Sequence, residues 1–256
     1  MRLTQTVVDW PLRRARLDAD EAYAAIARIG FDGVEMVPRD RWSAAQRAGL
    51  VVHSVAGPRT PEGLSHRTDH ETVLPQLRGA IAVARAAEIP YVVVFSGDRR
   101  GESNAAGIDA CAAGLDRLAP EATEAAVTLL LEILNTGDHP DYHAASSEFV
   151  FNVVRRVDSL AVRALYDAYH AARMGEPVID DVGAHARLIG HMHVAGAPRR
   201  DFPGANQEVD YRRLVSTALS AGYRGGWGHE YLPRGDVLPE LIASRALLQR
   251  YANESE

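Results

Sequence analysis

The chain has 256 residues, of which 46% are hydrophobic and 24% charged, as is ordinary for one large globular α/β domain. Its net charge of −6 disfavours binding through nucleic-acid phosphates, which normally requires a basic surface. All 28 basic residues are arginine, so chemistry that needs a lysine, such as Schiff-base formation or pyridoxal phosphate attachment, is excluded.

The single cysteine, Cys111, lies in an alanine-rich helical pattern and is expected to be buried. The first ten residues lack the apolar core of a signal peptide. No run approaches the roughly 18 apolar residues that a membrane span requires. We therefore expect a cytoplasmic location and no membrane partner.

Short β-rich runs alternate with amphipathic helical patterns along the chain. One early helical pattern places Ala22, Ile26 and Ile29 on one face and ends at Gly30. The expected strands are 3–8, 33–37, 51–55, 91–97, 128–135, 162–167, 190–195 and 225–231. The expected helices are 18–30, 42–48, 70–89, 107–126 with a break at Pro120, 147–157, 177–188, 211–221 and 238–251.

This alternation of strands and helices predicts a single (β/α)8 TIM barrel domain over residues 1–256. A doubly wound open sheet is the alternative. The first strand is followed by Asp9, Trp10 and Pro11 and not by a glycine-rich fingerprint, so we expect no nicotinamide cofactor. Residues 57–70 have no periodicity and are predicted to form a long loop at the carboxyl end of the third strand.

Four side chains with metal-binding chemistry lie at the ends of the last four predicted strands: Glu132, Asp167, His193 and Glu230. The carboxyl ends of barrel strands face a common mouth, so these residues are expected to converge. Three carboxylates and one imidazole suit Mn²⁺ or Mg²⁺, with Co²⁺, Fe²⁺ or Zn²⁺ also open. A bound cation would keep three buried carboxylates charged, since without one they would repel each other and take up protons.

The segments LLLEILNTGDHPDY, LYDAYH, IGHMHVAGAPRRDFPGANQEVDY and GYRGGWGHEYLP resemble the hydroxypyruvate isomerase branch of the xylose isomerase-like barrels, which also contain ketose 3-epimerases. GFDGVEM, TPEGLSHRTDHE and FSGDRRG fit this resemblance, which extends from about residue 30 onward. The resemblance implies that Glu132, Asp167, His193 and Glu230 bind one divalent ion. It also implies no organic cofactor, a small-molecule substrate, and Glu132 and Glu230 as the acid/base pair.

The resemblance further implies substrate contacts at His170, three residues after Asp167, and at Arg200. An arginine at this position could clamp a carboxylate through two hydrogen bonds. Glu35, on the second predicted strand, could bond a substrate hydroxyl, orient a metal ligand or have a structural role in the barrel mouth. His53, on the third, is a weaker candidate for substrate binding.

Several other aromatic and histidine side chains are predicted near the mouth of the barrel. Trp10 and Trp227 are candidates to wall the pocket, and His66 and His70 are expected to be exposed in the loop. The sequence departs from the hydroxypyruvate isomerase branch at His193, where glutamine is frequent, and at His229. We expect His229 to lie beside the metal site, and the departures leave the exact substrate open.

The predicted function is a divalent-metal-dependent isomerase of a small α-hydroxycarbonyl acid or sugar, with hydroxypyruvate to tartronate semialdehyde as the example. A proton removed from carbon gives an enediolate; its return to the neighbouring carbon isomerises the substrate. If the proton returned instead to the opposite face of the same carbon, the reaction would be an epimerisation. A ketose 3-epimerase is therefore the alternative function. A dehydratase or lyase, a three-zinc apurinic endonuclease and a catalytically silent sugar-binding protein fit less well. The last helix, at 238–248, is a candidate surface for self-association.

Overall fold

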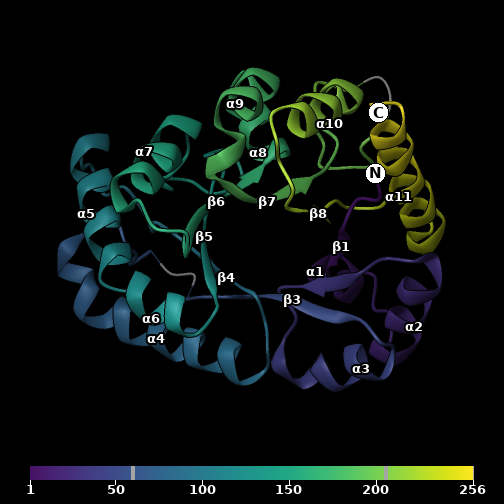
Figure 1. Cartoon of the computed structure of the whole chain (residues 1–256), viewed down its shortest axis with the longest axis horizontal. Helices are drawn as coiled ribbons and strands as arrows, with labels where there is room; N and C mark the ends of the chain where they lie inside the picture. Colours follow the sequence, from purple (N-terminus) through teal and green to yellow (C-terminus); the bar gives the residue numbers. More distant parts are fainter. Residues whose placement is uncertain (59–60, 205–206, 256) are drawn as a thin grey trace.

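The computed structural model describes residues 1–58, 61–204 and 207–255, and its eight parallel strands close into a barrel in chain order (Figure 1). The closing pair is β1 with β8, where Gln5 lies opposite Trp227. The barrel prediction is therefore confirmed, and the doubly wound open sheet is excluded. The strands are β1 Gln5–Val8, β2 Gly33–Glu35, β3 Val51–Ala56, β4 Tyr91–Val94, β5 Thr128–Glu132, β6 Val162–Asp167, β7 Ile189–Val194 and β8 Gly226–His229.

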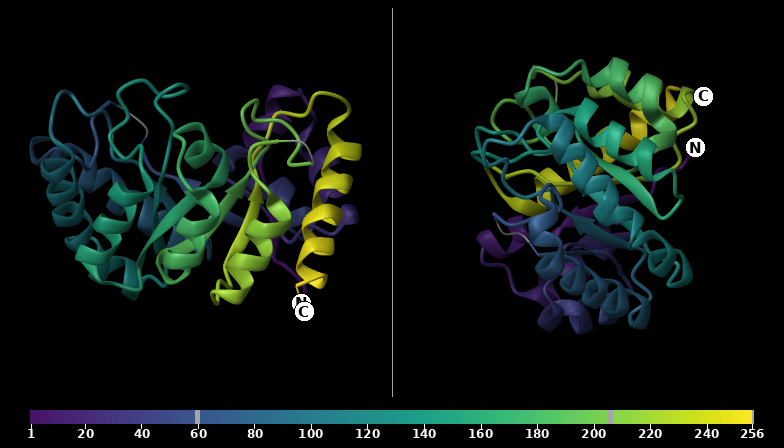
Figure 2. Two further views of the ribbon diagram at one scale, coloured as in Figure 1. Left: turned by 90° about the horizontal axis from the view of Figure 1, so that it is seen from above. Right: turned by 90° about the vertical axis from the view of Figure 1, so that its left-hand side faces the viewer.

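Helices surround the barrel, and both chain termini lie at one of its ends (Figures 1 and 2). The α-helices are α1 Asp9–Arg14, α2 Ala19–Ile29, α3 Trp42–Arg47, α4 His70–Ala86, α5 Asn104–Asp116, α6 Ala119–Glu124, α7 Ser147–Val157, α8 Ala168–Arg173, α9 Val178–His185, α10 Tyr211–Ser220 and α11 Val237–Asn253. Three short 3₁₀ helices are η1 Arg39–Arg41, η2 Arg67–Asp69 and η3 Ala186–Leu188.

Polar side chains fix several of the helix starts. The Asp18 carboxylate accepts hydrogen bonds from the first backbone N–H groups of α2, and Ser146 does the same for α7. Gly30 ends α2 in the left-handed conformation, with φ of 95°, as the sequence predicts. Pro120 lies in the first turn of α6, where no backbone N–H is needed, so the predicted break is confirmed and falls just before the proline.

Two short helices, α1 and α8, were not predicted, because each follows its strand with no intervening loop. The β4 strand ends three residues earlier than expected, since the chain turns away from the barrel after Val94. At this turn Gly97 has φ of 79°, and a Cβ there would lie 2.6 Å from the backbone nitrogen of Gly63. The shorter β5 and β8 likewise give way to loops at the carboxyl end of the barrel.

Glycines on β8 make room inside the barrel for large side chains of the neighbouring strands. A Cβ on Gly226 would lie 2.8 Å from a ring carbon of His191. A Cβ on Gly228 would lie 2.5 Å from a carboxylate oxygen of Glu35 and 2.7 Å from His193. The polar side chains at the centre of the barrel therefore require glycine at both positions.

The residues that alternate with these glycines point outward to the helices, since successive strand side chains face opposite sides. Trp227 is fully buried against Tyr223 and belongs to the core and not to the pocket wall, the two positions that the sequence left open. The His229 imidazole bonds to Gln5, with Nε2 2.9 Å from its side-chain oxygen, and to Ser244 of α11. The prediction that His229 lies beside the metal site is wrong.

Other expectations have mixed outcomes. Cys111 is buried, as predicted. His70 is buried and not exposed, because its Nε2 lies 2.9 Å from the carbonyl oxygen of Leu64; His66 is half-buried. Part of the predicted 57–70 loop, residues 59–60, falls outside the described residues. Among the helices that the structure describes, none has the length and apolar character to cross a membrane.

The proposed self-association surface on α11 stays a prediction. Ile242 is 53% exposed on this helix. Next to it, α2 and α11 line a surface hollow of about 520 Å³ with largely apolar walls.

Core packing inside the barrel can be tested at Leu130 of β5, which is fully buried and lies against Gly190. We expect Leu130→Ala to lower the free energy of unfolding by about 2–5 kcal/mol, because it leaves a cavity in a closely packed interior. Denaturant titration measures the change. The matched control is Leu160→Ala, since Leu160 is 84% exposed and its truncation should cost less than about 0.5 kcal/mol. Equal effects of the two substitutions would contradict the assigned packing.

Candidate active site

The four predicted metal-ligating side chains meet at the carboxyl end of the barrel. Glu132 and Asp167 end β5 and β6, His193 is the penultimate residue of β7, and Glu230 directly follows β8. All four are buried, and one potential ligand atom of each lies within 4.8 Å of those of the others. The structure thus brings together the whole set that was predicted from the strand ends.

The imidazole lies among the three carboxylates. His193 Nδ1 is 2.9 Å from Glu230 Oε2, 3.4 Å from Glu132 Oε1 and 4.0 Å from Asp167 Oδ2. Among the described residues, His193 Nδ1, Asp167 Oδ2 and Glu230 Oε2 have no partner with hydrogen-bond geometry, although Glu230 Oε2 is in ion-pair contact with His193 and Arg200. Buried polar atoms that converge without partners fit a bound cation, and three oxygens with one nitrogen suit a divalent ion.

The charges in this cluster shift the pKa values of its members. Burial opposes the charged imidazolium, but the carboxylates of Glu230, Glu132 and Glu35 outweigh it and raise the pKa of His193 well above its usual value. Burial and the nearby Glu230 carboxylate raise the pKa of Asp167 to about 7. For Glu230, Arg200 and His193 outweigh burial and hold its pKa well below the usual value. Protons therefore occupy the cluster when no cation does.

Atoms of these residues that do not face the cluster are tied to the surrounding structure. Asp167 Oδ1 accepts hydrogen bonds from the first backbone N–H groups of α8. The Trp10 indole N–H donates to Glu230 Oε1 at 2.6 Å. His193 Nε2 lies 3.3 Å from Glu35 Oε2. Each of these three ligands is thus oriented so that its other polar atom faces the cluster.

A pocket of about 240 Å³ adjoins the cluster. Trp10 lines it, as predicted. The lining also includes residues that the sequence did not single out, namely three apolar side chains and His139 in the loop after β5. The full lining is Trp10, Met36, Phe95, Glu132, Leu134, His139, His170, Arg200 and Glu230.

Arg200 lies between two aromatic rings at the edge of this pocket. Its guanidinium carbon is 5.2 Å from the ring centres of both Trp10 and Tyr169. One of its terminal nitrogens is 2.9 Å from Glu230 Oε2 and 3.9 Å from Asp167 Oδ2. The planar side chain is thus fixed with its cationic end at the boundary between the cluster and the pocket.

His170 is fully buried in the pocket wall, and its hydrogen bonds fix the position of its proton. Its Nδ1 accepts from the backbone N–H of Asn135 at 3.0 Å, so the neutral ring carries hydrogen on Nε2. Burial and the Arg200 cation hold the pKa of His170 well below its usual value, which keeps the ring neutral. Nε2 has no hydrogen-bond partner among the described residues and is a donor available to a ligand.

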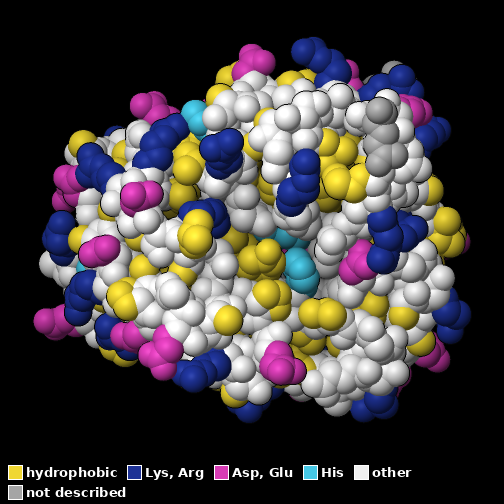
Figure 3. Space-filling model, in the orientation of Figure 1, with side chains coloured by type: hydrophobic (Ala, Val, Ile, Leu, Met, Phe, Trp, Pro, Cys, Tyr) yellow, Lys and Arg dark blue, Asp and Glu magenta, His cyan; other side chains and the backbone are white. Residues whose placement is uncertain are grey.

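Glu35 and His53, both predicted to contact substrate, are not among the residues that line this pocket. Glu35 lies inside the barrel beneath His193, fully buried. His53 lies further from the cluster, with its ring 5.2 Å from that of His191. Figure 3 shows histidine side chains at the centre of the barrel end where the termini lie. Neither side chain therefore borders the pocket beside the cluster.

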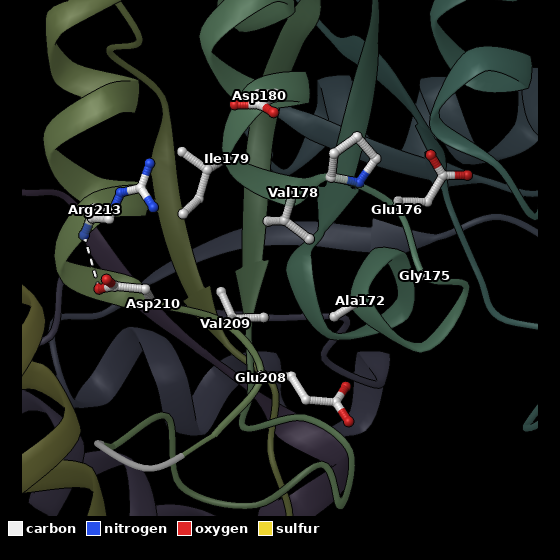
Figure 4. A pocket seen from close by; sticks show the side chains of 11 residues that line it. Ala172, Gly175, Glu176, Val178, Ile179, Asp180, Glu208, Val209, Asp210 and Arg213 are labelled. Carbon is white, nitrogen blue, oxygen red and sulfur yellow. Dashed lines mark hydrogen bonds between the residues drawn. The ribbon is translucent and has the colours of Figure 1, made fainter.

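A separate surface pocket lies between α9 and the start of α10 (Figure 4). Acidic side chains, among them Glu176, Asp180 and Glu208, lie around it with Arg213. None of the metal-ligating candidates lines this pocket. This surface pocket is therefore separate from the cluster and from the pocket beside it.

A buried carboxylate and histidine cluster at the mouth of a parallel barrel is typical of enzymes. The sequence model of the xylose isomerase-like TIM barrel family matches residues 23–250, and the chain belongs to this family. It is 26% identical over 252 residues to a putative hydroxypyruvate isomerase of Mus musculus, with 90% of each chain covered. It is 28% identical over 229 residues to a 2-oxo-tetronate isomerase of Cupriavidus necator, covering 84% of this chain and 87% of that one.

Solved structures with the same fold include enzymes with other names. An AP endonuclease of family 2 from Brucella melitensis superposes with a TM-score of 0.82 at 24% identity, covering 94% of this chain and 97% of that one. An L-ribulose 3-epimerase superposes with a TM-score of 0.82 at 17% identity, covering 99% and 96%. The IolI protein with a bound zinc atom gives 0.77 at 14% identity, covering 99% and 98%. At these identities the likeness shows the fold alone.

The pKa shifts predict that cation binding releases protons. The raised pKa values favour protonated His193 and Asp167 in the metal-free protein, and a cation needs both groups unprotonated. We expect about one or more protons to be released per ion, and affinity for Mn²⁺ to fall as the pH is lowered. Isothermal titration in buffers of different ionisation enthalpy measures the release. A heat that does not depend on the buffer would contradict the assigned protonation.

Proposed function

We propose that this chain is a divalent-metal-dependent isomerase of a small α-hydroxycarbonyl acid, with hydroxypyruvate as the leading candidate. The observation that carries the proposal is the convergence of Glu132, Asp167, His193 and Glu230 beside a pocket that presents Arg200. The named activities of the two relatives that cover most of the chain, both isomerases, support the same class.

The donor set supports one ion held by the four clustered residues. Mn²⁺ and Mg²⁺ suit its oxygen-rich character, and Co²⁺, Fe²⁺ or Zn²⁺ remain open for the same ligands. When bound, such an ion would act as a Lewis acid that stabilises the negative charge developing on an α-hydroxycarbonyl compound. We propose no organic cofactor.

The pocket favours a short acid over a long sugar. Its volume of about 240 Å³ is small, and Met36, Phe95 and Leu134 offer no hydrogen bonds to sugar hydroxyls. A long polyol would leave hydroxyls unpaired against these walls, which costs free energy. Arg200 is a charged donor suited to a carboxylate, and its aromatic neighbours hold it in place.

In the proposed reaction Arg200 binds the substrate carboxylate, and the Nε2–H of His170 donates to a substrate oxygen. One of the two glutamates, Glu132 or Glu230, removes a proton from C3 of hydroxypyruvate and leaves an enediolate. The other returns a proton to C2, while the C3 hydroxyl loses its proton and the former carbonyl oxygen gains one. The product is tartronate semialdehyde, with no net change in atoms or electrons.

A ketose 3-epimerase is the second candidate. The observation in its favour is that an L-ribulose 3-epimerase has the same fold along almost the whole chain. Its chemistry begins with the same proton removal, so the same glutamates would serve it. The two candidates differ in the carbon that receives the returning proton.

Deuterium labelling separates the two functions. The protein loaded with Mn²⁺ is incubated in D₂O with hydroxypyruvate or with D-fructose and L-ribulose; the ion is removed with EDTA before NMR spectroscopy. We expect conversion of hydroxypyruvate, with deuterium at C2 of the product. Deuterium at C3 of a ketose with inversion there would support the epimerase. If none of these compounds exchanged carbon-bound hydrogen for solvent deuterium, both proposals would be contradicted.

The role of Arg200 is tested by Arg200→Gln, which removes the charge but keeps a polar side chain. We expect the KM for hydroxypyruvate to rise about 10- to 100-fold, because a charged hydrogen bond to the carboxylate is lost. The matched control is Arg199→Gln, since Arg199 is exposed and pairs with Asp201. Steady-state kinetics should show little change in the control. A KM that stays the same in Arg200→Gln would show that the carboxylate binds elsewhere.

A further inference from the structure

We propose that Glu35 is a positioning residue that fixes the tautomer of His193 and so prepares it to bind the metal. The inference rests on the proposed metal site and concerns a residue that does not itself face the ion. Its basis is the contact between Glu35 Oε2 and His193 Nε2, at 3.3 Å, on the side of the ring opposite the cluster.

A carboxylate can only accept hydrogen bonds, so the ring nitrogen that faces Glu35 must carry the hydrogen. A neutral imidazole has one N–H, and with hydrogen on Nε2 its lone pair lies on Nδ1. Nδ1 is the atom that faces Glu230, Glu132 and Asp167. A metal-binding histidine usually donates its other ring N–H to a carboxylate, a backbone carbonyl or a water, and this contact sets its orientation and raises its basicity.

Donors from three strands hold Glu35 in this position. The Thr6 hydroxyl of β1 and Nε2 of His191 donate to Oε1, the latter at 2.8 Å. The Ser54 hydroxyl of β3 lies 3.4 Å from Oε2. Glu35 is fully buried, so its orientation depends on these neighbours and not on water.

Gly228 provides the space for this arrangement. A Cβ on this residue would lie 2.5 Å from Glu35 Oε1, 2.7 Å from His193 Cδ2 and 3.0 Å from His191 Nε2. These separations are too short for any side chain, so the backbone of β8 presses against all three residues at once. The three side chains pack as one unit beneath the ligand cluster.

The test substitution is Glu35→Gln, which has nearly the same shape. An amide presents an N–H₂ group as well as an oxygen, so it can accommodate a His193 ring with hydrogen on Nδ1. We expect the Kd for Mn²⁺, measured by isothermal titration, to rise about 10- to 100-fold. At saturating Mn²⁺ we expect KM for the substrate to stay close to that of the wild type.

The control is Asp9→Asn, which alters an equally buried carboxylate. Asp9 pairs with Tyr23, Arg13 and Arg41, and none of these contacts involves the four metal-ligating candidates. We expect this variant to lose stability in denaturant titration while its Kd for Mn²⁺ stays the same. If Asp9→Asn weakens metal binding as much as Glu35→Gln does, the effect is general destabilisation and the proposal fails.

The wild-type protein supplies a readout that does not depend on a variant. With Zn²⁺ bound, long-range ¹H–¹⁵N NMR spectra should show hydrogen on Nε2 of His193 and none on Nδ1. Hydrogen on Nδ1, or an unchanged Kd in Glu35→Gln, would overturn the positioning role. If the wild type binds no divalent ion at all, the proposed function fails first, and this outcome is distinct.

The number of bound ions provides the last check. Glu35, His53 and His191 also offer ligand atoms within 4.8 Å of one another. We expect one ion per chain by mass spectrometry of metal content. A second ion that is lost in Glu35→Gln and in His53→Gln, with the first Kd unchanged, would make Glu35 a ligand and overturn the proposal.

Discussion

Three carboxylates and an imidazole lie buried within a few ångströms of one another, and much of the surrounding structure serves to make this arrangement stable. Burying like charges together is unfavourable unless protons or a cation neutralise them. Fixed hydrogen-bond donors from outside the cluster contact the group formed by Glu132, Asp167, His193 and Glu230. Arg200 adds a positive charge at 2.9 Å from Glu230. The cluster therefore has the charge and the fixed geometry that could hold a cation.

In several residues of the site, one side-chain oxygen accepts a hydrogen bond from the surrounding structure and the other faces the site. Asp167 begins α8 with one oxygen and faces the cluster with the other. Glu230 accepts from Trp10 with one oxygen and meets Arg200 with the other. The structural and chemical roles of such residues are inseparable. Their substitution will alter local structure and ligand geometry together.

Much of the fold and the convergence of the four candidate ligands could be predicted because both follow local rules. Alternation of strands and helices specifies the barrel, and parallel strands bring their carboxyl ends to one mouth, which places Glu132 and His193 together. The direction of side chains near β8 was harder to predict. His229 and Glu230 are adjacent, yet only Glu230 faces the site, because successive side chains point to opposite sides of the barrel wall. The role of Glu35 depends on contacts with β1, β3 and β7, and no local pattern in the sequence reveals such contacts.

The contact between Trp10 and Glu230 spans the seam at which the barrel closes, since Trp10 follows the first strand and Glu230 the last. During synthesis Trp10 is added near the beginning of the chain and Glu230 near its end. A nascent chain that ends after the seventh strand already contains the Trp10 indole but lacks Glu230, the metal-ligating candidate that this indole orients. The candidate ligand set is therefore complete only when the last strand has joined the first, and closure of the barrel and assembly of the site are a single event.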